Sequence, residues 1–414
     1  MKQIRIAVFV LLLINLPAVG QQPVAIFNLQ NAVDLYMEKN LDLQAARFRL
    51  ERTRADQIVS LLRPNPGLTI AAENIPISGP SLPGRLYEVS ATYSETIELG
   101  GKRELRGRVA DLTVSTAEAQ FEDTMMRGLA EIKRLYYGAL LARYYVEIAN
   151  ENRQTFQQLA QFNLTRFEEG AIAEIDLIKV RLERMKVDSI QRQAELNYRQ
   201  AGIRLLEKLG ETVYSKSEIG GELDFRLTNL DLDLLRRSAL NERPDVLAAT
   251  REVEAASERL ALERARAKPD ITPFAGYKRI GSDNTVLFGV NIPLKIRDHN
   301  QAGIARAETD VRTAQTRLQQ VRNHALAEVE AAYDAVQMTR RQIETFQNEL
   351  LQQSEESRTI TLAAYEEGGT ELLPVLEAER TRSEVRQQYF KTLFDYQASI
   401  IDLELAVGRE IQQP

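Results

Sequence analysis

Two long stretches of the chain carry apolar residues at three- and four-residue steps, as helices do. One runs from Asn300 to Glu366 and the other from Glu104 to Glu168, and neither contains a proline. In the first of these, the apolar seam has coiled-coil spacing: Ile304, Ala307, Val311, Ala314, Leu318, Val321 and Ala325. At ~1.5 Å per residue, each stretch predicts a rod of about 100 Å, too long for a globular domain.

Shorter stretches with the same spacing flank the two rods, at residues 28–63, 171–209, 232–268 and 371–407. Each predicts one continuous helix. Prolines end the first and the third, at Pro64 and Pro269, because proline removes a backbone donor and clashes with the preceding turn. Gly210 ends the second, as glycine commonly does at helix C-termini. The chain is therefore predicted to be mainly helical.

Alternation of apolar and polar residues predicts strands in two places. The first hairpin spans 66–97, with strands at 67–73 and 86–97 joined by a Pro- and Gly-rich loop at 74–85. The second spans 270–294, with strands at 271–278 and 285–294 joined by a tight turn. Each strand has one apolar face, which in the last includes Val286, Phe288, Val290, Ile292 and Leu294.

The order of elements in the first half of the chain recurs in the second half. The matching pairs are Asn40 with Arg243 and Pro66 with Pro269, both 203 apart, and Phe167 with Tyr365 and Gly170 with Gly368, both 198 apart. The smaller offset is expected if the second hairpin has the shorter loop. We therefore predict a duplicated unit at residues 21–210 and 232–414, joined by an irregular link at 211–231.

The strands have the length and the one-sided apolar face of bilayer-crossing barrel strands. Four strands leave open edges, which lipid forbids, so such a barrel has to close through oligomerisation, and three chains would supply twelve strands. Tyr87 and Tyr93 share the apolar face and lie about 20 Å apart, which suits the aromatic girdles at the two membrane interfaces. A small periplasmic sheet capping a coiled coil would give the same pattern.

Composition narrows the function. The chain is acidic, with a net charge of −6 and no basic stripe, which argues against nucleic-acid binding. Lys2 and Arg5 precede an apolar run and the small residues Ala18-Val19-Gly20, so residues 1–20 are expected to be a secretory signal peptide. The absence of cysteine argues against disulfides, thiolate metal sites and a lipid on an N-terminal cysteine.

With these features, the chain resembles the TolC-type outer-membrane efflux factors over essentially its whole mature length. The likeness rests on the duplicated unit, on Pro66 and Pro269 before each hairpin, and on Arg166-Phe-Glu-Glu-Gly with its echo Tyr365-Glu-Glu-Gly. The octapeptide Thr96-Ile-Glu-Leu-Gly-Gly-Lys-Arg103 is most similar to the heavy-metal (cobalt–zinc–cadmium) branch.

The resemblance implies a TolC-like homotrimer: a twelve-stranded β-barrel in the outer membrane, continuous with an α-helical barrel that crosses the periplasm of a Gram-negative cell. It implies an export duct, here expected for heavy-metal cations, that works with a periplasmic adaptor and a proton-driven inner-membrane pump of the RND type. Drug efflux and type I protein secretion by the same fold stay open. A periplasmic coiled-coil protein without a pore is the alternative from another class.

The resemblance also implies roles for residues around the two glycine turns. The expected adaptor-docking residues are Phe167, Gly170, Ala171, Tyr365, Gly368 and Gly369. Family aspartates just after the turns line the closed aperture, and Asp176 matches one of them. Pro374 stands at the equivalent position of the second repeat, so Glu377, one helical turn on, is the expected carboxylate there.

Residues for other chemistry do not form recognisable motifs. The chain has two histidines, His299 and His324, which are 25 positions apart and have no cysteine or histidine companions, so no dedicated zinc site is expected. Gly100-Gly101-Lys102-Arg103 lacks the spacing of a phosphate loop. No nucleophile–base set is recognisable, and neither catalysis nor a cofactor is predicted.

Overall fold

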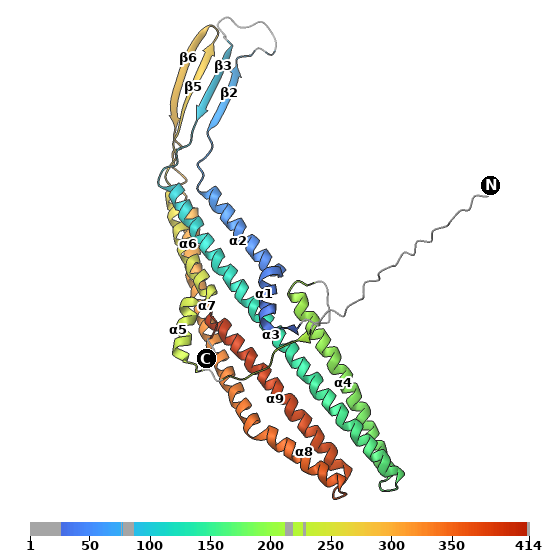
Figure 1. Cartoon of the computed structure of the whole chain (residues 1–414). Coiled ribbons are helices and arrows are strands. Elements are labelled where there is room, and N and C mark those ends of the chain that lie inside the picture. Colours follow the sequence, from blue (N-terminus) through green and yellow to red (C-terminus); the bar gives the residue numbers. More distant parts are fainter. Residues whose placement is uncertain (1–25, 76, 78–86, 212–217, 227–228, 412–414) are drawn as a thin grey trace, which may run out of the picture.

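The structure, a computed structural model, describes residues 26–75, 77, 87–211, 218–226 and 229–411. The expected signal peptide and most of the loop 74–85 lie outside the described residues. The chain is elongated, with a small sheet at one end and two helical hairpins at the other (Figure 1). None of the described helices combines the length and the apolar character that crossing a membrane would require.

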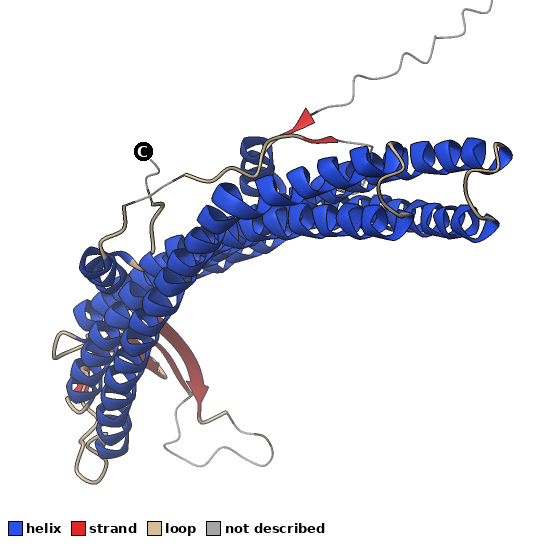
Figure 2. Ribbon diagram, turned by 90° about the horizontal axis from the view of Figure 1, so that it is seen from below, coloured by secondary structure: helices blue, strands red, loops and turns tan. Residues whose placement is uncertain are grey.

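Two helical hairpins form the end opposite the sheet. In hairpin 1, α3 (Lys102–Glu168) runs for 67 residues, about 100 Å, and α4 (Glu174–Lys208) returns along it. In hairpin 2, α7 (Gln301–Thr345), a π-helical turn η1 (Phe346–Leu350) and α8 (Leu351–Glu366) run down, and α9 (Leu372–Val407) returns. Seen from below, the helices follow a curved path (Figure 2).

The predicted uninterrupted second rod is therefore wrong at η1. A π-helical turn adds one residue to the helical repeat and so shifts the faces of the helix beyond it. Here the added turn brings Phe346 to a ring-centroid distance of 6.2 Å from Tyr389 of α9. The Gln347 side-chain amide donates to the Tyr389 hydroxyl at 3.0 Å. These contacts accompany the π-helical turn. In hairpin 1, α3 is a continuous α-helix and contains no such turn.

The helix predicted before each pair of strands, at 28–63 and at 232–268, is broken in two. The first half forms α1 (Leu29–Lys39) and α2 (Leu41–Ser60), and the second half forms α5 (Leu232–Glu242) and α6 (Pro244–Arg266). The predictions of continuous helices at 28–63 and 232–268 are wrong, because Asn40 and Arg243 adopt extended backbone with ψ of 125° and 124°. The breaks fall at the positions that the repeat had already paired.

Both break residues use buried side chains to hold the end of a returning helix. The Asn40 amide donates to the Lys208 carbonyl at 2.7 Å, and the Arg243 guanidinium donates to the Ala406 carbonyl at 3.2 Å. Those acceptors belong to the last turns of α4 and α9, whose carbonyls lack helical partners. The two repeats therefore make the same connection with different side chains.

The four strands form one antiparallel sheet in the order β2–β3–β5–β6. Their bounds are β2 Gly67–Glu73, β3 Glu88–Ser94, β5 Thr272–Ile280 and β6 Asp283–Asn291. The strand at 67–73 is confirmed, whereas the second and fourth strands are shorter than predicted and the third extends two residues further. β2 and β6 are edge strands, so each exposes an unpaired row of backbone groups.

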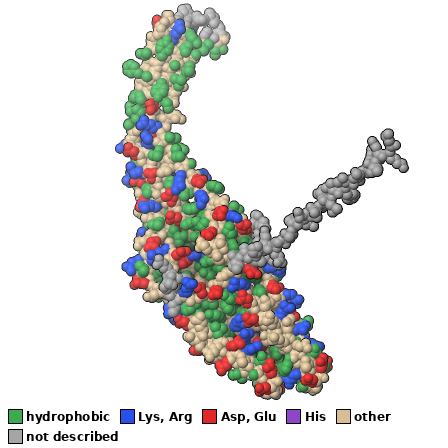
Figure 3. Space-filling model, in the orientation of Figure 1, with side chains coloured by type: hydrophobic (Ala, Val, Ile, Leu, Met, Phe, Trp, Pro, Cys, Tyr) green, Lys and Arg blue, Asp and Glu red, His purple; other side chains and the backbone are tan. Residues whose placement is uncertain are grey.

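The register separates the sheet into an apolar and a mixed face. One cross-strand row joins Leu68, Tyr93, Ala275 and Phe288, and the next joins Ile70, Ala91, Tyr277 and Val286. The opposite face has rows such as Ala71, Ser90, Lys278 and Thr285. Hydrophobic side chains accordingly gather over the strands in Figure 3, and charged ones are frequent along the helices. This is the pattern of a sheet with lipid on one side.

The middle of the molecule holds the largest apolar core, where both hairpins meet α1 and α5. A short parallel pair lies here: β1 (Ile26–Phe27), which precedes α1, pairs with β4 (Glu218–Ile219), which lies in the link that was predicted to be irregular. Arg143 of α3 donates to the Ile219 carbonyl at 2.6 Å, and Gln397 of α9 donates to the Asp224 carbonyl at 2.7 Å. The link is thus attached to both hairpins.

Candidate functional site

The two glycine turns at the hairpin tips have the same geometry. Gly170 and Gly368 adopt left-handed backbone, with φ of +73° and +80°. In the first turn the Ala171 amide donates to the Arg166 carbonyl at 2.8 Å, and in the second the Gly369 amide donates to the Ala364 carbonyl at 2.7 Å. These six-to-one bonds define Schellman motifs, which satisfy carbonyls at the end of a helix. No neighbouring atom lies within 4 Å of a β-carbon at either glycine, so backbone conformation alone favours glycine there.

Three residues join the two hairpins directly above the turns, and we call them the tip clasp: Asn163, Arg166 and Tyr365. The buried Tyr365 hydroxyl donates to the Asn163 side-chain oxygen. The Arg166 guanidinium lies 5.3 Å from the centre of the Tyr365 ring and donates to the Tyr365 carbonyl at 3.3 Å. Burial raises the pKa of Tyr365 above its ordinary value, so it stays a neutral donor.

The tip clasp corrects the expectation that Tyr365 belongs to a docking surface. Its side chain is 3% exposed, because it packs into a small core shared by both hairpins. The buried members of that core are Phe156, Leu159, Ala160, Val180, Val187, Tyr365, Leu372, Val375 and Leu376. Phe167 is 37% exposed, and Ala171, Gly368 and the backbone of both turns are accessible or half-accessible. The tyrosine is therefore a structural residue of the tip.

The two carboxylates expected at the gate lie on different hairpins and do not meet within the chain. Asp176 lies in the first turn of α4, is half-buried, and pairs with Lys179 at 3.2 Å. Glu377 lies in the second turn of α9 and is exposed, with no ion pair among the described residues. Pro374 fits the first turn of α9, where a helix has no use for the missing N–H.

Further ion pairs connect the hairpins above the tip, and sequence reasoning missed them. Glu151 of α3 accepts hydrogen bonds from Arg386 of α9, and Arg382 lies between Glu151 and Glu355 of α8. Arg386 holds the pKa of Glu151 below its usual value. Residues so far apart in sequence show no shared spacing, so only the fold reveals these pairs.

A buried ion pair lies within hairpin 2. Arg358 of α8 donates to Glu379 of α9 at 2.7 Å, and the glutamate side chain is 1% exposed. Its second carboxylate oxygen is buried and has no hydrogen-bond partner within the described structure. Arg181 stands at the equivalent position of hairpin 1, since 379 − 198 = 181, so this pair belongs to one repeat only.

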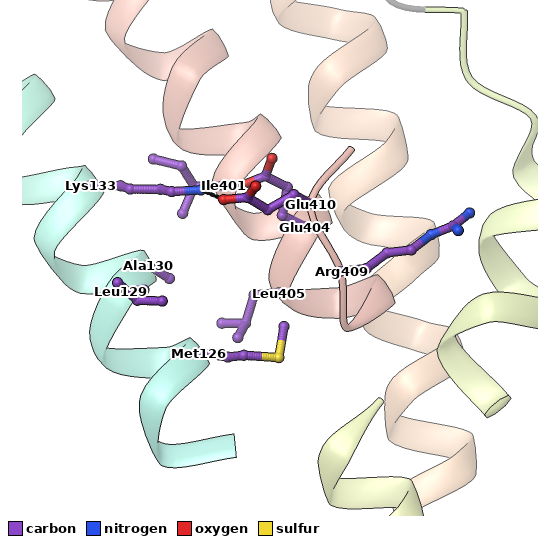
Figure 4. A pocket seen from close by; sticks show the side chains of 9 residues that line it. All are labelled: Met126, Leu129, Ala130, Lys133, Ile401, Glu404, Leu405, Arg409 and Glu410. Atoms are coloured by element: carbon purple, nitrogen blue, oxygen red, sulfur yellow. Dashed lines mark hydrogen bonds and ion pairs between the residues drawn. The ribbon is translucent and has the colours of Figure 1, made fainter. Parts of the chain in front are cut away.

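A small cavity of about 70 Å³ lies between α3 and the end of α9 (Figure 4). Lys133 reaches across it to Glu404 at 2.9 Å and to Glu410 at 3.0 Å. Burial alone would lower the pKa of Lys133, but the two carboxylates raise it above the ordinary lysine value. A charged lysine with two partners in so little space fastens the C-terminal segment to α3 and offers no room for a substrate.

The outer end of the sheet carries charged residues on its mixed face. Lys278 of β5 contacts Glu88 of β3 and lies 3.8 Å from Glu73 of β2. On the apolar face, Tyr93 and Tyr87 are both exposed, and the Tyr93 hydroxyl donates to Glu95 at 3.4 Å. Tyr87 directly precedes β3 and lies near the hairpin turns, since its carbonyl accepts from the Gly281 amide at 3.0 Å.

Within the described residues, no group of three or more histidine, cysteine, aspartate or glutamate side chains could hold a metal ion. The structure consists of a sheet with two unpaired edges, a central apolar core shared by both hairpins, and two hairpin tips that pack against each other.

Known proteins are similar to this chain over nearly its whole length. The sequence model described as "Outer membrane efflux protein" matches residues 32–211 and 235–409, one stretch for each half of the repeat. The cobalt-zinc-cadmium resistance protein CzcC of Cupriavidus metallidurans is 25% identical, over 95% of this chain and 93% of its own length. The cation efflux system protein CusC of Escherichia coli O157:H7 is 26% identical, over 91% and 85%.

Solved structures with the same fold cover nearly the whole chain. A crystal structure of CusC aligns with a TM-score of 0.78 at 20% identity, over 92% of both chains. The CmeC outer membrane channel of Campylobacter jejuni aligns with a TM-score of 0.79 at 19% identity, over 93% of this chain and 86% of its own. At these identities the likeness concerns the fold.

Proposed function

Because the chain belongs to the outer membrane efflux protein family, we propose that it is the outer-membrane duct of an export system for heavy-metal cations. The family resemblance and the TolC-like fold inferred from the sequence are confirmed. The protein is an efflux channel of the outer membrane that extends into the periplasm, with its sheet in the membrane and its helical tips at the far end. We propose the identity of its cargo, its assembly as a trimer and its contact with a periplasmic adaptor.

One observation carries the duct: a four-stranded sheet, apolar on one face and open at both edges, on top of helices about 100 Å long. Lipid does not tolerate open edges, so β2 of one copy has to pair with β6 of the next. Three copies give twelve strands, an even number wide enough for a lumen. We therefore assign the chain to a homotrimer.

Exposed apolar residues along α4 support the same assembly. They follow three- and four-residue steps at Ile175, Ile178, Leu182 and Met185, each between 41% and 64% exposed. Such a row is a coiled-coil seam without a partner inside this chain. In a trimer, a helix of the neighbouring copy would cover it.

The tips are the proposed docking site for a periplasmic adaptor, which connects the duct to an inner-membrane pump. Family members work in such three-part systems. The proposed contact residues are Phe167, Gly170 and Ala171 of hairpin 1 with Gly368 and Gly369 of hairpin 2. Their exposed side chains and backbone support this role, and Tyr365 is left out because it is buried.

Asp176 and Glu377 are the proposed gate carboxylates. Three-fold repetition would bring like charges together in a narrow mouth, where they attract cations and repel one another unless paired. Asp176 has a pairing partner in Lys179, whereas Glu377 has none among the described residues, so the two contribute differently. The tip clasp, which fastens hairpin 1 to hairpin 2, would have to loosen or move as one body when the mouth opens.

The metal cargo is supported by the names of the relatives and is tested by a deletion strain. Growth is measured across Zn²⁺, Co²⁺, Cd²⁺ and Cu⁺ and across a panel of organic drugs, with the wild-type gene on a plasmid as the control. The proposal expects hypersensitivity to at least one metal that the plasmid reverses. Sensitivity to drugs alone would replace the metal cargo with an organic one and leave the duct intact. No catalytic step is proposed, because the family consists of channels.

A further inference from the structure

A short segment at the lower end of the sheet, from Ile292 to Arg297, presents apolar and basic side chains to solvent. It follows β6 directly and belongs to no strand or helix. Leu294 and Ile296 are 74% and 72% exposed. Lys295 and Arg297 alternate with them and are also exposed. Next to the apolar face of the sheet, these two exposed side chains extend an apolar patch of the kind that marks an interaction site.

The position of the segment suggests its depth in the membrane. β5 and β6 have nine residues each, which is about the minimum for a tilted strand to cross the hydrocarbon core. The edge of the hydrocarbon therefore lies near the last residue of β6, Asn291. Ile292 and Leu294 keep the two-residue spacing of Val286, Phe288 and Val290 on the apolar face. Ile292 and Leu294 thus continue the lipid-facing surface into the headgroup layer on the helical side. The Ile296 amide then donates to the Leu294 carbonyl at 2.9 Å, and this turn ends the alternation of faces before Arg297.

The two cations have no partner within the described chain. Neither Lys295 nor Arg297 forms an ion pair or a side-chain hydrogen bond there. Asp298 accepts from the Asn300 amide at 2.8 Å, which engages it in a local turn. Asp270, whose carboxylate feels the field of Lys295, is bound to Lys102 at 2.7 Å. The positive charges are therefore available to an outside anion.

The equivalent junction of the first repeat is closed by its own chain. The left-handed residues before α3 and α7 are Gly101 and Asn300, 199 apart, so Arg297 corresponds to Glu98. Glu98 is paired with Arg106, which also donates to the Ser60 carbonyl at 3.1 Å. The same place in the fold is acidic and satisfied in one repeat but basic and open in the other.

We propose that Leu294–Arg297 binds an anionic phospholipid of the periplasmic leaflet. Leu294 and Ile296 lie at the boundary between the acyl chains and the headgroups, and Lys295 and Arg297 contact the headgroup phosphate, as long basic side chains do at membrane interfaces. The proposal rests on the outer-membrane placement given above. The phosphates of lipopolysaccharide lie in the opposite leaflet, beyond the β5–β6 turn at Gly281, and do not reach this segment. A trimer would carry three such sites.

The test uses the full-length trimer in detergent, offered phosphatidylglycerol or phosphatidylcholine with matched acyl chains. Retained lipid is counted by native mass spectrometry, and the melting temperature is read with each lipid. The wild type is expected to retain phosphatidylglycerol preferentially. In K295Q/R297Q the ratio of retained phosphatidylglycerol to retained phosphatidylcholine is expected to fall at least fivefold, because each basic residue near an anionic surface contributes roughly a fivefold gain in binding. Raising the salt should weaken the preference of the wild type.

The matched control is R317Q/R322Q, which removes two exposed charges from α7 roughly 30 Å along the helix from the segment. It is expected to bind lipid as the wild type does. Equal retention of both lipids by the wild type, or an unchanged preference in K295Q/R297Q, would overturn the proposal. Dissociation of the K295Q/R297Q trimer with an unchanged lipid preference would also overturn it, because the segment would then contact a second copy of the chain and not lipid. None of these outcomes depends on the exported cargo. If the protein were absent from the outer membrane, the proposed function would fail, and that result is distinct from a failure of the lipid site.

Discussion

The two hairpins of the chain have the same backbone turns and different side chains around them. Both tips end in a Schellman motif around a left-handed glycine, and both repeats break the upper helix at a residue that holds the end of a returning helix. Hairpin 1, however, contains one continuous 67-residue helix, whereas the rod of hairpin 2 is interrupted by the π-helical turn at Phe346–Leu350. Asp176 follows the first turn, and Pro374 occupies the equivalent position after the second.

The difference shows which features a duplicated unit retains. Turns and breaks fix where each helix points, and in the proposed trimer three copies of two such units have to fit one ring, so backbone geometry is tightly constrained. Ion pairs on the helices are freer to differ, as the buried Arg358–Glu379 pair of hairpin 2 illustrates. The two hairpins should therefore fail in the same way when a turn is altered and in different ways when a side chain is removed.

The largest difference is expected at the helix breaks. The variant R243M removes a buried guanidinium that bonds to Asp245, to Glu328 and to the Ala406 carbonyl. We expect a loss of about 2–3 kcal/mol, because hydrogen bonds to charged groups contribute about 1.5–3 kcal/mol. N40A, which loses two neutral hydrogen bonds, should lose about 1–2 kcal/mol. Denaturant unfolding of the trimer measures both, with R322M as the exposed control. Equal losses would contradict a stronger connection in the second repeat.

The breaks also show what the sequence could and could not predict. Pro244 directly after Arg243 is a regular start for a helix, so the second break was readable from Pro at the first helical position. Asn40 could have been read as a cap, but the apolar spacing runs through it and favours one helix. The turn η1 contains ordinary helix formers and no glycine or proline, so nothing local marks it.

The next largest effect is expected at the turns, where the hairpins should respond alike. Valine in place of Gly170 or Gly368 has to adopt left-handed backbone, which costs a β-branched residue roughly 1–2 kcal/mol. No neighbour crowds either position, so G170V and G368V should destabilise the trimer by similar amounts. Asparagine tolerates this conformation better and serves as the control at both sites. Unfolding midpoints that differ widely between the two valine variants would show that the tips are not equivalent.

The tip should respond unequally to loss of charge. If the two carboxylates hold the closed mouth, D176A/E377A should raise ion leakage in planar bilayers several-fold. Of the single variants, D176A should have the larger effect, because Asp176 is half-buried and paired while Glu377 is exposed. E356Q, at an exposed position of α8, is the control. Unchanged conductance in the double variant would remove both residues from the gate.

The candidate site was only partly predictable for a physical reason. Glycine turns and strand alternation are local patterns, so the tips and the sheet could be inferred from neighbouring residues. The tip clasp joins Asn163 and Arg166 to Tyr365, about two hundred positions away, and no pattern in the sequence predicts such a contact. The tyrosine shares its motif with exposed residues, and only packing between the hairpins shows that it is buried.

The smallest effect is expected from pH. Arg386 holds the pKa of Glu151 below its ordinary value, so this link stabilises the folded state at pH above the ordinary carboxyl value and is lost as pH falls through the lowered pKa. The melting temperature of the wild type should therefore fall between pH 5 and pH 3, and E151Q should remove a small part of that fall. The effect is modest because the glutamate is 46% exposed. An identical pH profile for E151Q would show that the link contributes nothing measurable.

The most direct test of the duct is whether the edge strands of neighbouring copies pair. The natural chain contains no cysteine, so introduced pairs are unambiguous. T69C on β2 is combined in turn with T285C, L287C or N291C on β6, all on the mixed face, and oxidised in outer membranes. β2 and β6 are opposite edges of one sheet, so a disulfide can form only between copies. We predict covalent species up to the trimer for at least one pair, and monomers alone for T69C paired with every partner would contradict the barrel.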